Sequence, residues 1–417
     1  MARGIKITFC LVLGFLLRGP SPAFSYNAQS SAETLSATIL PVVDSLDPFS
    51  GNRYFSGFDG PYIFKQGNGY QILRVTRKGD RYIFREEKRS EVKNHQFRCS
   101  VDNEDNDIFH FKLRKKLKAP KSIYPQPEKM LAISDIEGNF NPLYSLLLNN
   151  GVMNKTYQWT YGKGHLVLIG DFMDRGKNVT EVLWLIYHLE QEAEKWGGMV
   201  HFILGNHEIM NLQGTTNYVD EKYIQLAKQY SGITEKSTAY ARLMGKNQEL
   251  IQWMKSKNAM EKIGKTLFVH GGISPELLNT RLTIYEINEL IRNRLKNAYA
   301  PDEYSRVAQD FLFAGLGPLW YRGLAIPYRN LYPKISQEEL EKIIRYFKVD
   351  HIAIGHTIAK EISAEMEGII LRTDVRHGNI KNSSASQGLL IEKEQYYRVN
   401  GKGEKWLLLD ENPSSGH

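Results

Sequence analysis

Cysteine is nearly absent from this chain, which has only Cys10 and Cys99 among its 417 residues. If the segment around Cys10 is removed on export, as predicted below, one thiol remains and no disulfide framework can form. A large packed hydrophobic core must therefore stabilise the fold.

The chain also lacks a strong excess of either charge. Its formal net charge of +8 falls to +5 without the first 25 residues, so no nucleic-acid partner is expected. The composition, 42% hydrophobic and 24% charged, is close to average globular usage and excludes wholesale disorder or collagen-like structure. No apolar run reaches the ~20 residues needed to span a bilayer, so no stable membrane insertion is expected.

The first 25 residues have the pattern of an export signal. Arg3 and Lys6 give it a positive start, residues 7–17 form an apolar run, and Ala23-Phe24-Ser25 places small residues before a cleavage point. We therefore expect a signal peptide over residues 1–25, cleaved after Ser25, and a periplasmic or extracellular mature protein. An uncleaved membrane anchor is the alternative interpretation.

The length predicts two or three domains. Residues 26–56 are rich in Ser, Ala and Asn and are typical of a linker. Over residues 57–120, short runs of β-forming residues separated by glycine-containing turns predict a small antiparallel β domain. The basic stretch 112–121 marks its end, and we interpret that stretch as a solvated linker in preference to a binding patch.

From residue 127 to about 400 the pattern changes to buried strands that alternate with helices. Short apolar runs that end in polar or glycine-rich turns occupy residues 130–134, 166–169, 200–204, 266–269 and 351–354. Helical periodicity is found at residues 142–149 and 179–194 and after Ser336, where Glu339 completes a capping box. This alternation predicts an α/β layered domain, with a largely helical insertion at about 211–263 and a closing hairpin over 388–399.

Each of the five predicted strands is followed directly by side chains that could bind metal ions. The loops are Asp135-Ile136-Glu137, the segment 170–176 with Asp171 and Asp174, Gly205-Asn206-His207-Glu208, the loop of His270 and the loop of His356. Loops at the carboxyl ends of such strands meet at one edge of the sheet. Alone, each has an ordinary explanation, such as a helix N-cap or a structural histidine, but five in succession favour a dinuclear metal site.

Two of these loops resemble the motifs of a known family. Residues 170–176 match the Gly-Asp-x-x-Asp-Arg-Gly block, and residues 205–208 the Gly-Asn-His-Glu block, of the calcineurin-like metallophosphoesterases, in particular their phosphoprotein phosphatase branch. The resemblance covers roughly residues 130–374. It implies an αββα sandwich, to which the small N-terminal antiparallel β domain is an addition.

The resemblance also implies an activity, the hydrolysis of phosphomonoesters by direct attack of a metal-bound hydroxide in a dinuclear site. The implied substrate is a phosphorylated small molecule or a phosphoprotein. By position, Asp171 would bridge two divalent metal ions, because a carboxylate can offer one oxygen to each. The other implied ligands are Asp135 and Glu137 for the first ion and Asn206, His270 and His356 for the second.

The same resemblance assigns the proton transfer and the binding of phosphate. His207 would protonate the leaving oxygen as a general acid, and Asp174 would hold His207 in its productive orientation. Arg175 and Arg322 would bind the phosphate, since a planar guanidinium matches two of its oxygens. Arg322 is also compatible with a buried structural arginine beside aromatic residues.

The first motif departs from the family, which has histidine at the position of Glu137. If Glu137 is a ligand, it joins Asp135 and Asp171 in an all-oxygen shell, which favours Mn²⁺ and leaves Fe, Zn and Mg²⁺ as the other candidates. If Glu137 points away, the domain could be a weakly active or non-catalytic pseudophosphatase that acts as a binding protein. The retained general acid and its orienting carboxylate favour an active enzyme.

Overall fold

The computed structural model describes residues 57–79, 81–296 and 302–411, all of which belong to one compact unit, Pro48–His417. The predicted signal peptide, residues 1–25, and the predicted linker, residues 26–56, lie outside the described residues. Within the described ranges, every helix falls short of the length or the hydropathy needed to cross a membrane.

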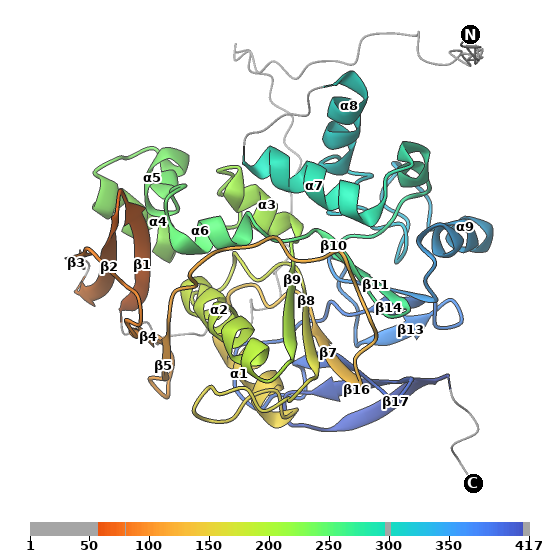
Figure 1. Cartoon of the computed structure of the whole chain (residues 1–417), viewed down its shortest axis with the longest axis horizontal. Helices are drawn as coiled ribbons and strands as arrows, with labels where there is room; N and C mark the ends of the chain where they lie inside the picture. The colour runs from red at the N-terminus through yellow and green to blue at the C-terminus, as the bar shows by residue number, and fades with distance from the viewer. Residues whose placement is uncertain (1–56, 80, 297–301, 412–417) are drawn as a thin grey trace, which may run out of the picture. The chain divides into compact units, whose positions relative to one another are not determined.

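Two six-stranded sheets form the centre of this unit (Figure 1). The first sheet has the strand order β17-β16-β15-β7-β8-β9, in which β7, β8 and β9 are parallel. Its strands are β7 (Lys129–Ile133), β8 (His165–Ile169), β9 (Met199–Ile203), β15 (Gln387–Glu392), β16 (Gln395–Asn400) and β17 (Lys405–Asp410). The three predicted parallel strands and the closing hairpin of β15 and β16 are confirmed.

The second sheet has the strand order β13-β14-β12-β11-β10-β6. Its strands are β6 (Ile123–Tyr124), β10 (Met260–Ile263), β11 (Thr266–Val269), β12 (His351–Ile354), β13 (Ser363–Glu365) and β14 (Ile370–Arg372). The central strands β11 and β12 are parallel and correspond to the last two predicted strands.

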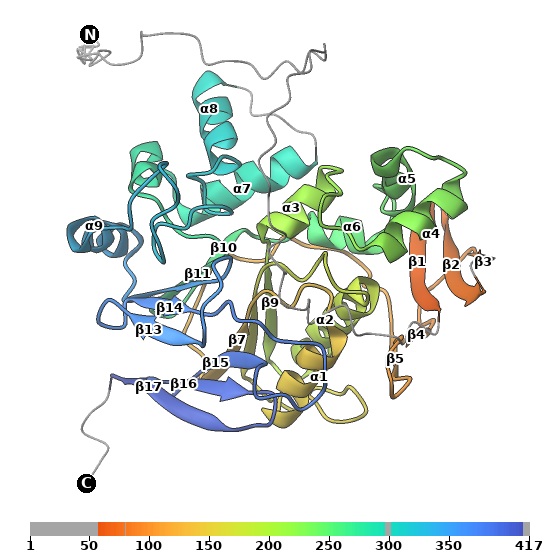
Figure 2. The same ribbon diagram turned by 180° about the vertical axis from the view of Figure 1, so that it is seen from behind.

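The two sheets pack face to face, with helices on both outer faces (Figures 1 and 2). Because successive side chains of a strand point to opposite faces, Ala132 of β7 and Ala353 of β12 lie in the core between the sheets, whereas Leu131 and Ile352 lie in the core shared with the helices. These helices are α1 (Phe140–Asn149) and α2 (Val179–Lys195) on one side, and α7 (Ile284–Leu295), α8 (Glu303–Leu312), α9 (Gln337–Phe347) and the 3-10 helix η1 (Pro275–Thr280) on the other. The predicted αββα sandwich is confirmed.

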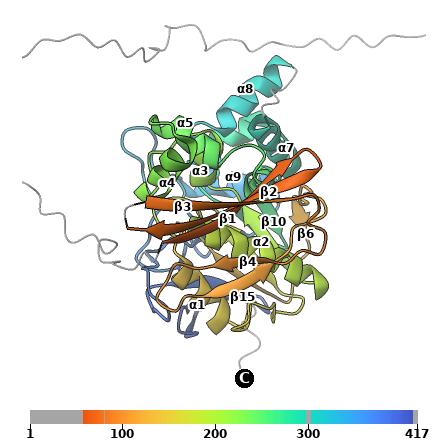
Figure 3. The same cartoon turned by 90° about the vertical axis from the view of Figure 1, so that its left-hand side faces the viewer.

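A small antiparallel sheet precedes the sandwich, as predicted, and packs against α2 (Figure 3). It consists of β1 (Phe58–Gln66), β2 (Gly69–Lys78) and β3 (Arg81–Arg89), and is followed by the pair β4 (Phe97–Ser100) and β5 (Ile108–Phe111). Trp184 of α2 donates its indole N–H to the Pro61 carbonyl at 2.8 Å and stacks on Phe111 at 4.1 Å. The N-terminal strands therefore share one hydrophobic core with the sandwich.

The predicted insertion at about 211–263 contains helices and ends in strand β10. It follows α3 (Asn206–Leu212) and comprises α4 (Glu221–Ser231), α5 (Lys236–Leu243) and α6 (Glu249–Met254). Lys222 of α4 forms a buried ion pair of 2.7 Å with Asp59 of β1. The insertion is thereby joined to the N-terminal sheet as well as to the sandwich.

Candidate active site

Three of the five loops that follow the central strands have an unusual backbone. Asp135, Asp171, Asp174, Arg175 and His356 all have positive φ values, between 53° and 69°. Non-glycine residues seldom adopt this conformation, and where they do it often marks a functional site. The turns bring the polar side chains together at the carboxyl end of the strands, as the sequence pattern predicts.

Glu208 holds two of these loops together. Its buried carboxylate accepts hydrogen bonds from the amides of Asp171 at 2.9 Å, Phe172 at 2.8 Å, Met173 at 3.1 Å and Gly205 at 2.8 Å. The turn after β8 is therefore fixed against the start of α3. Sequence reasoning includes Glu208 in the second motif but assigns it no role, although a glutamate at the third position of a helix is a recognisable capping signal.

Three buried side chains form the centre of the site, and their ligand atoms lie within 4.8 Å of one another: Asp171, His270 and His356. His270 Nε2 is 3.1 Å from Asp171 Oδ2 and 2.9 Å from Asn206 Oδ1. Asp135 lies beside them, because its Oδ2 accepts the amide of His356 at 3.2 Å. The structure thus gathers five of the six predicted metal ligands.

The electrostatics of this cluster follow from its burial and its charges. Burial raises the pKa of Asp135, and the neighbouring Asp374 raises it further. Burial alone would also raise the pKa of Asp171, but the adjacent His270 and His207 lower it below its usual range. Burial and the nearby His270 lower the pKa of His356, which keeps that imidazole neutral.

The donor set fits divalent metal ions. His356 Nε2 is buried and has no hydrogen-bond partner among the described residues, so a nitrogen lone pair is available in the cluster. Carboxylate and amide oxygens together with two imidazoles form a set that suits Mn²⁺, Fe or Zn. A buried polar atom without a partner is destabilising unless a ligand satisfies it.

His207 lies at the rim of the cluster and is held by a chain of hydrogen bonds. Its Nδ1 is 2.7 Å from Asp174 Oδ2, and Asn211 donates to the other Asp174 oxygen at 2.8 Å. Tyr240 in turn donates its hydroxyl to Asn211 Oδ1 at 2.7 Å. Burial alone would lower the pKa of His207, but Asp171 and Asp174 raise it. Sequence reasoning missed Asn211 and Tyr240.

The two predicted phosphate-binding arginines are held by different loops of the site. Arg175 is partly exposed and forms an ion pair with Glu137. Arg322 donates to the carbonyl of His356 and to Thr357 Oγ1, the latter at 3.2 Å. The Glu137 carboxylate is therefore paired with Arg175 and does not belong to the group formed by Asp171, His270 and His356.

Comparisons with known proteins agree with this geometry. The family model for the calcineurin-like phosphoesterases matches residues 128–360. The chain is 29% identical over 231 residues to Shewanella-like protein phosphatase 1 of Plasmodium berghei, a match that covers 55% of this chain and 61% of the relative. It is 24% identical over 272 residues to Shewanella-like protein phosphatase 2 of Arabidopsis thaliana, with coverages of 56% and 67%.

The fold is also similar to a solved structure. The crystal structure of a cold-active protein-tyrosine phosphatase from a psychrophilic Shewanella species aligns with a TM-score of 0.70 and 30% sequence identity, and the match covers 84% of this chain and 99% of the other. The family's activity makes the protein a phosphoester hydrolase. This chain therefore belongs to the calcineurin-like phosphoesterase family.

Proposed function

We propose that this protein is a metal-dependent phosphatase that hydrolyses phosphomonoesters in a dinuclear site. The observation that carries the proposal is the buried group of Asp171, His270 and His356 beside the pair of His207 and Asp174. Asp135, Asp171, Asn206, His270 and His356 would hold two divalent ions, with Mn²⁺ favoured. Such ions, when bound, polarise phosphate oxygens and make a bound water more acidic.

His207 is positioned to supply a proton to the leaving oxygen. Its Nδ1 is occupied by Asp174, while its Nε2 faces the cluster, 3.7 Å from Asp171 Oδ2. A leaving group whose phosphorus is held at the cluster would therefore lie within reach of Nε2. Asp174 stabilises the protonated ring, which is the form that a general acid requires.

The arginines supply positive charge for the substrate phosphate. Arg175 is 44% exposed, so its side chain can turn toward a phosphate. Without substrate, its ion pair with the Glu137 carboxylate holds it near the site. Arg322 is anchored to the loop of His356 and would contact the phosphate from that loop. A guanidinium can donate two parallel hydrogen bonds to a phosphate.

We infer that the substrates are phosphorylated proteins and that aryl phosphates such as phosphotyrosine are preferred. Tyr218 is 48% exposed, and its ring lies 5.0 Å from the His207 ring and 5.5 Å from the Arg175 guanidinium. An aromatic leaving group next to His207 can pack against this ring, which a serine phosphate cannot do. The similarity to a protein-tyrosine phosphatase and to two protein phosphatases supports the same class of substrate.

The proposal is tested with purified protein and added Mn²⁺. We expect p-nitrophenyl phosphate to be hydrolysed, and EDTA to abolish the reaction. We expect kcat/KM to be higher for a phosphotyrosine peptide than for the same peptide with phosphoserine, and Tyr218→Ala to reduce that preference by about tenfold or less, in line with one aromatic contact. Tyr285→Ala, which removes an exposed ring on α7, is the control. Absence of metal-dependent turnover would contradict the proposal.

We also propose that the protein acts outside the cytoplasm, because residues 1–25 have the pattern of an export signal. Fusion of residues 1–30 to a reporter enzyme that is active only after export tests this directly. Activity of the fusion supports export, whereas inactive fusion protein that accumulates in the cytoplasmic fraction contradicts it.

A further inference from the structure

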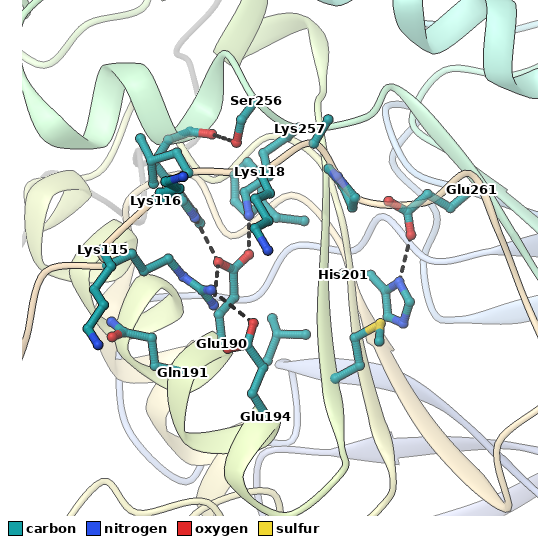
Figure 4. Close-up of a pocket in the computed structure, with 18 of the residues that line it drawn as sticks. Lys115, Lys116, Lys118, Glu190, Gln191, Glu194, His201, Ser256, Lys257 and Glu261 are labelled. Carbon is teal, nitrogen blue, oxygen red and sulfur yellow. Dashed lines mark hydrogen bonds and ion pairs between the residues drawn. The ribbon is translucent and has the colours of Figure 1, made fainter.

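A cavity of about 730 Å³ lies beneath residues 114–120, here called the basic strap (Figure 4). Its other walls come from the C-terminal half of α2, from residues 199–202 of β9 and from the segment 253–261. This cavity is lined by residues 199–202 of β9, and its lining includes none of the candidate metal ligands or of His207. The cavity is therefore separate from the candidate active site, and its size is typical of ligand-binding sites.

The basic strap is fixed at both ends and free of backbone hydrogen bonds in between. At one end Gln191 donates to the Lys112 carbonyl at 2.7 Å, and the Arg114 amide donates to Tyr187 at 2.7 Å. At the other end Asn258 donates to the Lys121 carbonyl at 2.8 Å. Within the described residues, the backbone groups of residues 115–120 bond to no other part of the chain. The strap thus crosses the cavity without closing it.

The facing wall is the open edge of a sheet. Strand β9 is the last strand of its sheet and pairs with β8, and on its outer side only its last residue, Ile203, is bridged within the described residues, by Asn258. The Met199 amide points toward β8, because it bonds to the Gly164 carbonyl, so Val200 and Phe202 direct their amides and carbonyls to the outer side. Leu204, two residues after Phe202, has the same orientation, because its amide bonds to the Asn258 carbonyl on the outer side. Across the described ranges, no residue bonds outward to the backbone of Val200 or to the amide of Phe202, whereas Asn258 bridges the end of the strand at Ile203.

The carboxylates of the cavity already have partners within the chain. Glu190 forms ion pairs with Lys257 and, at 3.3 Å, with Arg114, and Arg114 also reaches Glu194 at 2.9 Å. Glu261 lies 2.6 Å from His201. Arg114 and Lys257 neutralise Glu190 and Glu194, so these two carboxylates do not repel an acidic ligand as isolated glutamates would.

The lysines of the strap are not neutralised in this way. Lys115, Lys116 and Lys118 line the cavity, are exposed, and have no ion-pair partner in the described part of the chain. Apolar side chains complete the lining, among them Leu117, Met199, Phe202 and Trp253. The cavity thus combines three unpaired positive charges, an apolar surface and a row of unused backbone groups.

We propose that this cavity binds an extended acidic peptide segment, which adds to the free edge of β9 as a further strand. The backbone of the segment pairs with the outward N–H and C=O of Val200 and with the amide of Phe202, in the manner known as β-augmentation. Because side chains alternate along a strand, acidic ones face the strap lysines and the others face the apolar lining. This role is an alternative to the interpretation of residues 112–121 as a solvated linker, and it does not depend on the proposed catalytic reaction.

The binding is tested by fluorescence anisotropy with the full chain and a labelled octapeptide of alternating Glu and Val. A peptide of alternating Lys and Val is the comparison. We expect the acidic peptide to bind and the basic peptide not to bind, because only the former complements the strap charges.

One variant reverses the charges of the three strap lysines, and another removes one outward backbone N–H of β9. The triple variant K115E/K116E/K118E should weaken binding at least about tenfold, whereas K93E/K155E/K402E, which reverses three exposed lysines elsewhere, should not. Val200→Pro removes one outward N–H without breaking a bond to β8, as an edge strand tolerates, and should weaken binding about fivefold or more. Val200→Ala keeps that N–H and is its matched control.

Each outcome decides the question. The proposal is supported if the strap variant and Val200→Pro lose binding of the acidic peptide. Both variants must also keep their hydrolysis of p-nitrophenyl phosphate and their melting temperature. The proposal is overturned if the acidic peptide does not bind, or if either variant binds it as the wild type does while remaining folded. Sedimentation of the chain with phosphatidylserine vesicles, in place of peptide binding, would also overturn it and would assign the strap to membrane lipids.

Discussion

Replacing Asp174 with asparagine tests how the protein prepares His207 for proton transfer. In the native chain, Asn211 accepts the Tyr240 hydroxyl through its oxygen, which fixes its NH2 group toward Asp174 Oδ1. An asparagine at position 174 would keep its own oxygen toward Asn211 for the same reason. It would therefore present its NH2 group to His207 Nδ1, where the native protein has a carboxylate oxygen at 2.7 Å.

That reversal removes the support for the protonated ring. An NH2 group donates and cannot accept, so Nδ1 must lose its proton and the charge-assisted hydrogen bond disappears. A hydrogen bond to a charged group contributes about 1.5–3 kcal/mol. At about 1.36 kcal/mol for each factor of ten in rate, Asp174→Asn should lower kcat by about 10- to 200-fold when the leaving group needs a proton.

The leaving group separates this explanation from a structural one. With phenyl phosphate, whose phenolate is a poor leaving group, we expect the full decrease in kcat given above. With 2,4-dinitrophenyl phosphate, whose leaving group needs no proton, we expect kcat to change little. Equal losses for both substrates, in a variant with native metal content and melting temperature, would refute the assignment of His207 as the general acid and of Asp174 as its support.

Three further substitutions test other parts of the account. Glu137→Gln should leave the metal content unchanged and lower KM, because it frees Arg175 for the phosphate; loss of metal in this variant would make Glu137 a ligand. Glu181 is buried, and its burial raises its pKa to about 8. The folded state therefore holds a proton between about pH 4.5 and 8 that the unfolded state has lost, so the free energy of unfolding should fall as pH rises through that window. Urea unfolding of Glu181→Gln should show a flatter dependence, and an unchanged slope would contradict the shift. Trp184→Phe should lower the free energy of unfolding by about 1–3 kcal/mol, because the buried Pro61 carbonyl loses its donor; a loss below about 0.5 kcal/mol would show that the indole bond adds little.

Much of the sandwich could be predicted from the sequence, because its central strands are short apolar runs that end at the catalytic loops. The prediction succeeded for β7, β8, β9, β11 and β12, and for the capping box of Ser336. It missed β6 and β13, which have two and three residues and owe their conformation to pairing with a neighbour. It also missed β17, whose side chains are mostly exposed and show no clear alternation.

Those residues of the site that directly follow a strand could be predicted from the sequence. Asn211 is one helical turn after His207 and could have been noticed, but nothing near it in the sequence points to Tyr240, which lies 29 residues further along. The partner of Glu137 depends on how two turns approach each other, and this is a property of the folded backbone. For the same reason, the basic stretch resembles any solvated linker until the fold places it over the edge of β9.

The central claim is that Asp171, His270 and His356 take part in holding two divalent ions that the reaction requires. It is tested most directly by elemental analysis of the purified, active protein, alongside His270→Ala prepared in the same way. We predict about two divalent ions per native chain, a clear loss in the variant, and activity that falls in proportion to the metal content. Full activity in native protein that contains no stoichiometric metal would contradict the claim.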